Sequence, residues 1–193
     1  MFTLDDLVRL DSVTQGGADL LRGIATARAS FLVYARPRNA GKSTLTQAIL
    51  AAASPDIPRR DFLGTEREVE ALSAEPRRGY LVVAEIGHRG RPGYLAGEEV
   101  ARVFRLVAQG WAVASSLHAD SVDEVFAVLS QNGVEPAAAA SVRYLAKVRA
   151  LGDPDAADTK RVVEDVHEIG GIGQGQRPVS TLLYRWPGAA SAP

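Results

Sequence analysis

The sequence predicts an α/β fold in which helices flank a mostly parallel sheet. Three short, almost wholly apolar runs predict strands that are buried on both faces, at residues 31–35, 80–85 and 111–118. Between them lie stretches with the apolar periodicity of helices, at residues 45–53 and 98–109. Buried strands that alternate with helices are typical of a parallel sheet covered by helices on both sides.

The chain of 193 residues is long enough for one domain with a sizeable core. We expect this domain to span residues 1–186, with residues 187–193 as a tail. Residues 1–28 are expected to form two N-terminal helices, the first capped by Thr3 and separated from the second by a pair of glycines at residues 16–17.

The last third of the chain predicts an antiparallel hairpin. Strands at residues 144–150 and 160–169 flank a polar turn, and a last strand follows at residues 179–186. The glycine-rich stretch at residues 170–177 resembles a dinucleotide-binding fingerprint, but no predicted helix follows it, so we reject that function.

Composition and charge limit the classes of function. The net charge is −1, which does not support binding to nucleic acid, so we expect no direct nucleic-acid partner. The absence of cysteine excludes a disulfide framework and a thiol nucleophile, and the three histidines lack metal-site spacing. No apolar stretch approaches the length of a membrane span and no signal-peptide pattern opens the chain, so we expect a cytoplasmic protein.

The junction between the first strand and its helix carries the clearest chemistry. Gly41-Lys42-Ser43 stands at the expected helix start, where backbone N–H groups have no partner within the helix and the helix dipole attracts anions. Lys42 would reach the β- and γ-phosphates of a nucleotide, and Ser43 would hold Mg²⁺. The predicted nucleotide-binding residues are Arg36, Asn39, Ala40, Gly41, Lys42, Ser43 and Thr44. The alternative is an ordinary strand–turn–helix, in which Ser43 or Thr44 only caps the helix.

The loop departs from the phosphate-loop pattern at two positions. The first glycine of the pattern is Arg36 here, which either reshapes the loop or brings a second cation near the phosphates. Asn39 is a milder change, because Asn tolerates left-handed backbone.

Two polar residues end predicted strands at the same edge of the sheet. Glu85 ends the second strand and His118 ends the third, and open α/β sheets bind ligands at the carboxyl ends of their strands. Glu85 is predicted to act either on the attacking water or in the Mg²⁺ shell. His118 is either a structural histidine or a sensor of the γ-phosphate or of a neighbouring subunit.

In chain order the three strand ends carry Gly-Lys-Ser, Glu and His, and here the sequence resembles the ATPases of type II and type IV secretion systems and type IV pili. The resemblance runs from about Leu20 to Trp186. Its motifs are a Walker A loop, an Asp box, a Walker B strand, a His box and a late hairpin, at residues 35–44, 65–70, 83–86, 110–119 and 161–168. The His box is the most specific match.

This resemblance implies a RecA-like P-loop NTPase domain that uses ATP and Mg²⁺. It implies catalytic roles for Glu85, His118 and Glu66, and Mg²⁺ ligation by Ser43 and Glu85. It also implies a homo-oligomer, a hexamer in this family, that works with secretion or pilus machinery, with a peripheral location at the inner face of the membrane.

Several positions differ from the motifs of the family. Arg67 replaces the aspartate of the Asp box, and Trp111 replaces the first histidine of the His box. The N-terminal domain that supplies arginines to the nucleotide in this family has no counterpart in the sequence, so we expect another source, such as a separate chain. Arg89, Arg91 and Arg102 are candidates within the chain, and each could equally be a solvated surface residue.

Two functions therefore stay open. The first is a Mg²⁺-ATP hydrolase that drives protein export or pilus assembly, which the retained lysine, serine, glutamate and histidine favour. The second is a degenerate homologue that acts as a nucleotide-binding or structural subunit without hydrolysis, which Arg36 and Arg67 favour. A DNA-translocating relative with the same fold lacks support from the net charge.

Overall fold

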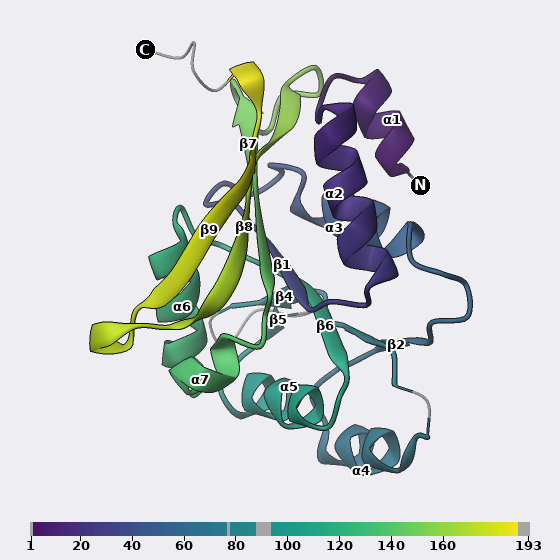
Figure 1. Ribbon diagram of the computed structural model, residues 1–193, viewed down its shortest axis with the longest axis vertical. Helices are drawn as coiled ribbons and strands as arrows, with labels where there is room; N and C mark the ends of the chain where they lie inside the picture. The colour runs from purple at the N-terminus through teal and green to yellow at the C-terminus, as the bar shows by residue number, and fades with distance from the viewer. Residues whose placement is uncertain (1, 77, 88–93, 189–193) are drawn as a thin grey trace.

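A nine-stranded mixed sheet forms the centre of the computed structural model, which describes residues 2–76, 78–87 and 94–188 (Figure 1). Seven strands follow one path, in the order β2 (Arg59–Asp61), β3 (Tyr80–Val82), β6 (Ala112–Leu117), β1 (Phe31–Tyr34), β7 (Tyr144–Leu151), β8 (Lys160–Ile172) and β9 (Pro178–Arg185). Off this path, β4 (Glu85–Ile86) pairs with β5 (Tyr94–Leu95) and with β6. The strand pairs from β2 to β7 are parallel, whereas β7–β8 and β8–β9 are antiparallel. The predicted fold class, including the C-terminal antiparallel strands, is confirmed.

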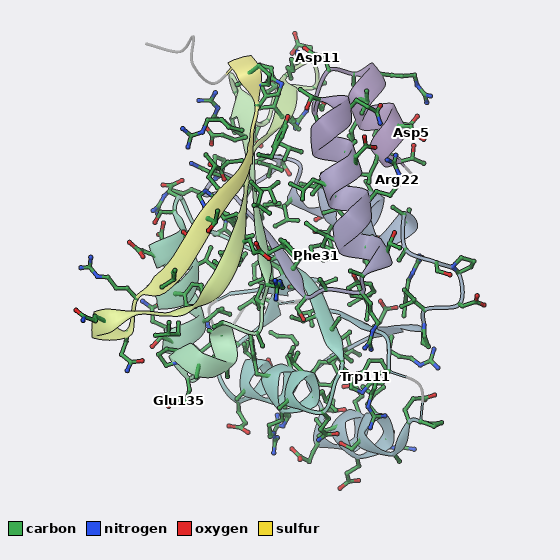
Figure 2. All side chains as sticks on the ribbon, in the orientation of Figure 1. Asp5, Asp11, Arg22, Phe31, Trp111 and Glu135 are labelled. Carbon is green, nitrogen blue, oxygen red and sulfur yellow. The ribbon has the colours of Figure 1, made fainter. Side chains whose placement is uncertain are left out.

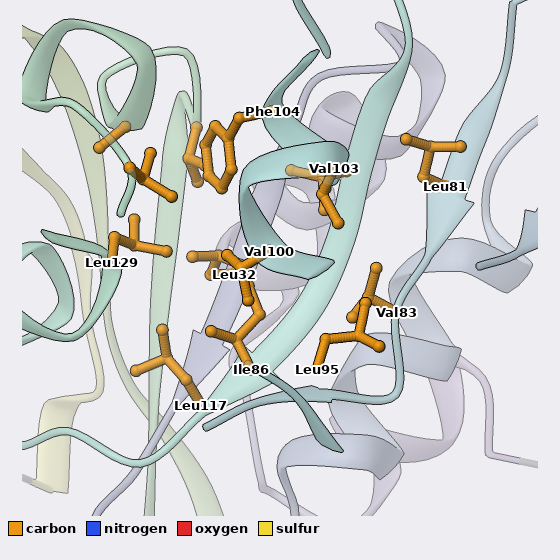
Figure 3. Packing of buried hydrophobic residues seen from close by; sticks show 14 of the residues in the cluster. Leu32, Leu81, Val83, Ile86, Leu95, Val100, Val103, Phe104, Leu117 and Leu129 are labelled. Carbon is orange, nitrogen blue, oxygen red and sulfur yellow. The ribbon is translucent and has the colours of Figure 1, made fainter. Parts of the chain in front are cut away.

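Each face of the sheet has its own apolar core. Three helices cover one face and four cover the other: α1 (Leu4–Arg9), α2 (Gln15–Thr26) and α3 (Lys42–Ala51), and α4 (Glu66–Ala74), α5 (Glu98–Ala108), α6 (Val122–Gln131) and α7 (Pro136–Ala139). The central strand β1 serves both cores, since Phe31 belongs to the first and Leu32 to the second. Figure 3 shows Leu32 beside Val100 of α5 in the second core. Among the described residues, no helix is long and apolar enough to cross a membrane.

The first helix begins at the predicted cap. The Thr3 hydroxyl accepts a hydrogen bond from the N–H of Asp6, and the Asp6 carboxylate accepts one from the N–H of Thr3. This reciprocal pair satisfies two N–H groups that a helix start leaves open. Arg22 of α2 then holds Asp5 of α1 at 2.8 Å, and the two labelled side chains lie side by side in Figure 2.

The predicted helix break at residues 16–17 is wrong. The helix α2 starts at Gln15, with Thr14 as its cap, and both glycines lie in its first turn. A Cβ at Gly17 would lie 2.6 Å from the Tyr184 ring of β9 and 2.7 Å from Val13. Gly17 therefore lets the last strand approach the second helix, a contact that sequence spacing does not reveal.

Two of the three C-terminal strands, β7 and β8, are longer than predicted, whereas β9 has the predicted length. The strand β8 runs to Ile172, so the glycine-rich stretch begins inside a strand, and a short 3₁₀ turn at Gln174–Gln176 leads into β9. Register shifts bend β8 against both neighbours, near Lys147 on one side and His167 on the other.

Candidate functional site

A cleft of about 1060 Å³ opens where α3 begins, at the carboxyl ends of the parallel strands. Every predicted site residue except Arg36 and Glu66 lines it. One wall is the loop before α3, residues 35–41, called here the α3 loop, together with the first turn of α3. The facing wall comes from α1 and from the β7–β8 end of the sheet, which lie far from the α3 loop in sequence.

The start of α3 leaves its first N–H groups open to the cleft. The helices α1, α2, α4 and α6 each begin with a Thr or Ser side chain that accepts a hydrogen bond from the third helical N–H. In contrast, α3 begins at Gly41, which makes no such bond and has a left-handed φ of 99° that favours glycine. In the described part of the chain the first N–H groups of α3 therefore lack a capping side chain, and the positive end of the helix dipole lies at the cleft and attracts anions.

The strand β8 holds the α3 loop through Arg161. Its Nε donates a hydrogen bond of 2.7 Å to the carbonyl of Asn39, and its two terminal nitrogens donate to Thr159 at 2.8 Å and Pro154 at 2.9 Å. The Asn39 side chain donates to Asp155 at 2.7 Å, and Asn39 has the left-handed backbone that its residue type allows. Sequence reasoning placed Arg161 in a late motif but assigned it no role.

The Lys42 ammonium is buried but loosely held. Its side chain is 7% exposed, and its nearest oxygens are the Pro37 carbonyl at 3.4 Å and Glu85 Oε1 at 3.8 Å. Both ring nitrogens of His118 lie 3.5 Å away. Burial lowers the pKa of Lys42, and the charge of Glu85 offsets only part of this effect. A buried cation with only long contacts is suited to binding an anion.

Glu85 and His118 form a close pair beside Lys42. His118 Nδ1 lies 2.6 Å from the carbonyl oxygen of Arg36, and since a carbonyl only accepts, Nδ1 carries the hydrogen. His118 Nε2 lies 2.9 Å from Glu85 Oε1. Within the described residues, this buried oxygen still has no aligned hydrogen bond. A carboxylate oxygen left open in this way can serve a bound water or cation.

The oxygen donors of the cleft fit Mg²⁺. Ser43 lines the cleft from the first turn of α3, and Glu85 lines it from β4. Mg²⁺ prefers oxygen ligands, keeps several waters and is usually held by one or two protein groups together with substrate phosphates. The two side chains predicted as metal ligands thus share one cleft and have suitable chemistry.

Arg36 points away from the cleft. Its guanidinium forms ion pairs with Asp120 and with Glu124 of α6, the latter at 2.7 Å. The hydrogen bond to Asp120, together with the charges of both carboxylates, raises the pKa of Arg36. Of the two roles predicted for Arg36, these contacts support shaping of the loop, because they fasten its start to α6.

Glu66 also lies outside the cleft. It starts α4 and is bound by Arg102 at 2.7 Å and by Arg105 at 3.2 Å. The hydrogen bond from Arg102 and the charge of Arg105 hold the pKa of Glu66 below its usual value. Arg102 is therefore engaged on the surface, while the other two candidate arginines, Arg89 and Arg91, lie outside the described residues.

Two contributors to the cleft were missed by sequence reasoning. Tyr94 lines the cleft, and a Cβ at Gly87 would lie 2.5 Å from its ring, so the glycine makes room for it. The N-terminal segment supplies Phe2 and Leu10, which are 51% and 55% exposed and line the cleft. No motif marks these apolar side chains, because their role depends on how α1 packs.

Comparison with solved structures finds the VirB11 ATPase from the type IV secretion system of Brucella suis, determined in complex with sulphate. The match covers 78% of this chain and 51% of that one, with a TM-score of 0.57 and 16% sequence identity. The two share a fold. The chain spans about half the length of that structure, and no family profile and no curated protein matches it. The predicted resemblance to secretion ATPases is confirmed at the level of the fold.

Proposed function

We propose that this chain binds ATP with Mg²⁺ in the cleft and hydrolyses it, as a motor subunit of the secretion-ATPase kind. One observation carries the proposal. The uncapped start of α3, with the loosely held Lys42, opens onto the same cleft as the Glu85–His118 pair. An anion-binding end and a carboxylate with an open oxygen are the two halves that phosphoanhydride hydrolysis requires.

The phosphates lie against the first turn of α3. The N–H groups of Lys42, Ser43 and Thr44 bind phosphate oxygens, and Lys42 neutralises charge on the β- and γ-phosphates. Ser43 and Glu85 would hold Mg²⁺, which when bound screens the charge of the phosphates. Asn39 and Ala40 shape the loop around them, since Arg161 anchors its backbone.

Glu85 orients the attacking water. Its Oε1 accepts a hydrogen bond from the water, which attacks the γ-phosphorus as the bond to the leaving ADP oxygen breaks. His118 stands between Glu85 and the Arg36 carbonyl, so its ring lies beside the carboxylate, where it senses the γ-phosphate.

The apolar end of the cleft accepts the nucleotide base. Phe2 and Leu10 offer exposed apolar surface there. The segment that carries Leu10 is tied to β8, because Lys160 binds Asp11 and the N–H of Val163 donates to the carbonyl of Ser12 at 2.8 Å. A planar base gains affinity by covering such a surface.

The proposed motor works as an assembly of several copies of the chain. By likeness to a type IV secretion ATPase, we infer a homo-oligomeric ring, a hexamer, that serves secretion or pilus machinery from the cytoplasmic side of the membrane.

A second candidate is a subunit that binds nucleotide without hydrolysis. The position of Glu66 favours it, because Arg102 and Arg105 hold this predicted catalytic carboxylate outside the cleft. Glu85 would then contribute only to cation binding.

Turnover and binding by two variants separate these functions. Mg²⁺-ATP hydrolysis is measured over a range of protein concentrations, for the wild type and for Glu85→Gln and Lys42→Ala. The motor predicts that Glu85→Gln still binds ATP while turnover collapses, and that Lys42→Ala loses binding. Turnover that rises with protein concentration indicates sites formed between subunits. Binding with equal, negligible turnover in wild type and Glu85→Gln supports the second candidate.

A further inference from the structure

Arg38 stands at the junction of two hollows. It lines the main cleft, and it also lines a smaller hollow of about 260 Å³ beside it. Tyr94 and His118 line both hollows as well. Arg38 is exposed, and among the described residues it has no hydrogen-bond or ion-pair partner.

The other described arginines around the site are engaged. Arg36 is paired with Asp120 and Glu124 of α6. Arg161 donates hydrogen bonds to the carbonyl of Asn39 in the α3 loop and to the carbonyls of Thr159 and Pro154 in the β7–β8 turn. Arg38 thus differs from its neighbours in having a guanidinium that is free to meet a ligand.

Arg38 shares the phosphate-binding end of the cleft with a second cation. Lys42, at the start of α3, lines the same cleft four positions further along the chain. Two cations that repel each other beside an uncapped helix start create a site that favours a multiply charged anion. The side of the cleft with His118 and Glu85 is where the terminal phosphate would lie.

We propose that Arg38 binds the terminal phosphoryl group of the nucleotide from within the same chain and stabilises the charge that develops during its transfer. This inference rests on the proposed function. Water forms the new bond to the γ-phosphorus and passes a proton to an oxygen of the phosphate product, while the bond to the β–γ bridging oxygen breaks and ADP leaves with that electron pair. Arg38 donates hydrogen bonds to the phosphoryl oxygens and exchanges no proton or covalent bond.

The proposal assigns opposite roles to two arginines that are two positions apart. Arg36 fastens the α3 loop to α6, so its loss should affect every nucleotide alike. Arg38 meets only a group that ATP has and ADP lacks, so its loss should affect ATP selectively. Arg36→Ala is therefore a matched control for Arg38→Ala, with the same charge removed from the same loop.

The test compares ATP with ADP. Dissociation constants for both nucleotides with Mg²⁺ are measured by calorimetry, and kcat by phosphate release, for wild type, Arg38→Ala, Arg38→Lys and Arg36→Ala. We expect Arg38→Ala to raise the dissociation constant of ATP about tenfold, since one charge-assisted contact is lost. The dissociation constant of ADP should stay within about twofold of the wild-type value. We expect its kcat to fall on the order of 100-fold, with partial rescue in Arg38→Lys, whose point charge lacks the planar fork.

Several outcomes overturn the inference. If Arg38→Ala weakened the affinities for ATP and ADP equally, Arg38 would provide only a general attraction for anions. If ATP affinity and kcat were unchanged, Arg38 would have no role at the site. In both cases binding of ATP by the wild type would leave the proposed function standing. A wild type that binds neither nucleotide overturns both. Because Arg38 is exposed and makes no hydrogen bond or ion pair with the described part of the chain, its variant should keep the wild-type unfolding midpoint, which is the check on folding.

Discussion

Arg161 Nε donates a hydrogen bond of 2.7 Å to the carbonyl oxygen of Asn39, across 122 positions of sequence. This bond and two more from the same guanidinium tie the β7–β8 turn to the α3 loop. The shape of the anion-binding loop thus depends on a strand near the other end of the chain.

Removal of Arg161 should loosen the loop. We expect Arg161→Ala to lower the free energy of unfolding by about 1–3 kcal/mol, because backbone carbonyls lose a charged hydrogen-bond donor. The same variant should also bind ATP with lower affinity. Arg161→Lys should recover part of the stability only, because one ammonium cannot span three carbonyls. Urea unfolding and calorimetric titration measure both effects, with Arg177→Ala as the control for lost charge. Wild-type ATP affinity in Arg161→Ala would contradict this role.

The burial of Lys42 should make stability depend on pH. Its folded-state pKa is lowered, chiefly by burial, so the unfolded chain holds the proton more tightly. Below the folded pKa both states are charged, and the folded state carries the whole cost of burying the ammonium. This cost declines as pH rises through the folded pKa and is absent above the ordinary lysine pKa of about 10.4.

Lys42→Met is the variant that reveals this cost. It should be more stable than the wild type at pH 7, and the difference should shrink as the pH is raised towards 10. Urea unfolding without nucleotide at a series of pH values measures the difference. A gain that grows with pH would mean that the sign of the pKa shift is wrong.

The apolar end of the cleft predicts that a variant there should change the binding of a nucleotide but not that of inorganic triphosphate. Leu10→Ser should lower the affinity for ATP severalfold, since about 1 kcal/mol of apolar contact is lost. It should leave the affinity for inorganic triphosphate unchanged. Leu183→Ser removes a similarly exposed leucine that lies on β9 and does not line the cleft. Competition titrations with ATP and triphosphate make the comparison. Equal weakening of both ligands would refute a base site at α1.

The two glycines that open α2 should respond oppositely to alanine. Nothing lies within 4 Å of a Cβ at Gly16, so Gly16→Ala should be neutral or stabilise by up to about 1 kcal/mol. Gly17→Ala drives a methyl group into the Tyr184 ring, whose hydroxyl accepts a hydrogen bond from the N–H of Thr14 at 3.2 Å. We expect a loss of about 1–3 kcal/mol. Thermal unfolding of the two variants measures these changes in stability. Similar unfolding midpoints for both variants would argue against close packing of β9 on α2.

Sequence alone predicted the elements that carry strong local patterns. The strand at Phe31–Tyr34 is fully apolar because both of its faces are buried, and that pattern is visible without a structure. The predicted strand at residues 80–85 is wrong in one respect, because β3 ends at Val82 and Glu85 opens the short strand β4. Glu85 still lies beyond the carboxyl end of β3, as His118 lies beyond that of β6, so the two could be predicted to meet at one edge of the sheet. Glu85, His118 and Lys42 do share one cleft.

Tertiary structure decided what each charged side chain does. Arg36 and Arg38 are two positions apart in one loop, yet the segment that leads into α6 and its first turn supply Arg36 with two carboxylates, Asp120 and Glu124. Glu66 was predicted in the site, but α5 draws it away through Arg102. Sequence periodicity indicates which residues are buried, whereas the hydrogen-bond and ion-pair partners of a charged side chain come from elements far apart in the chain. Local sequence thus determined where the anion-binding cleft forms, and long-range packing determined which residues reach it.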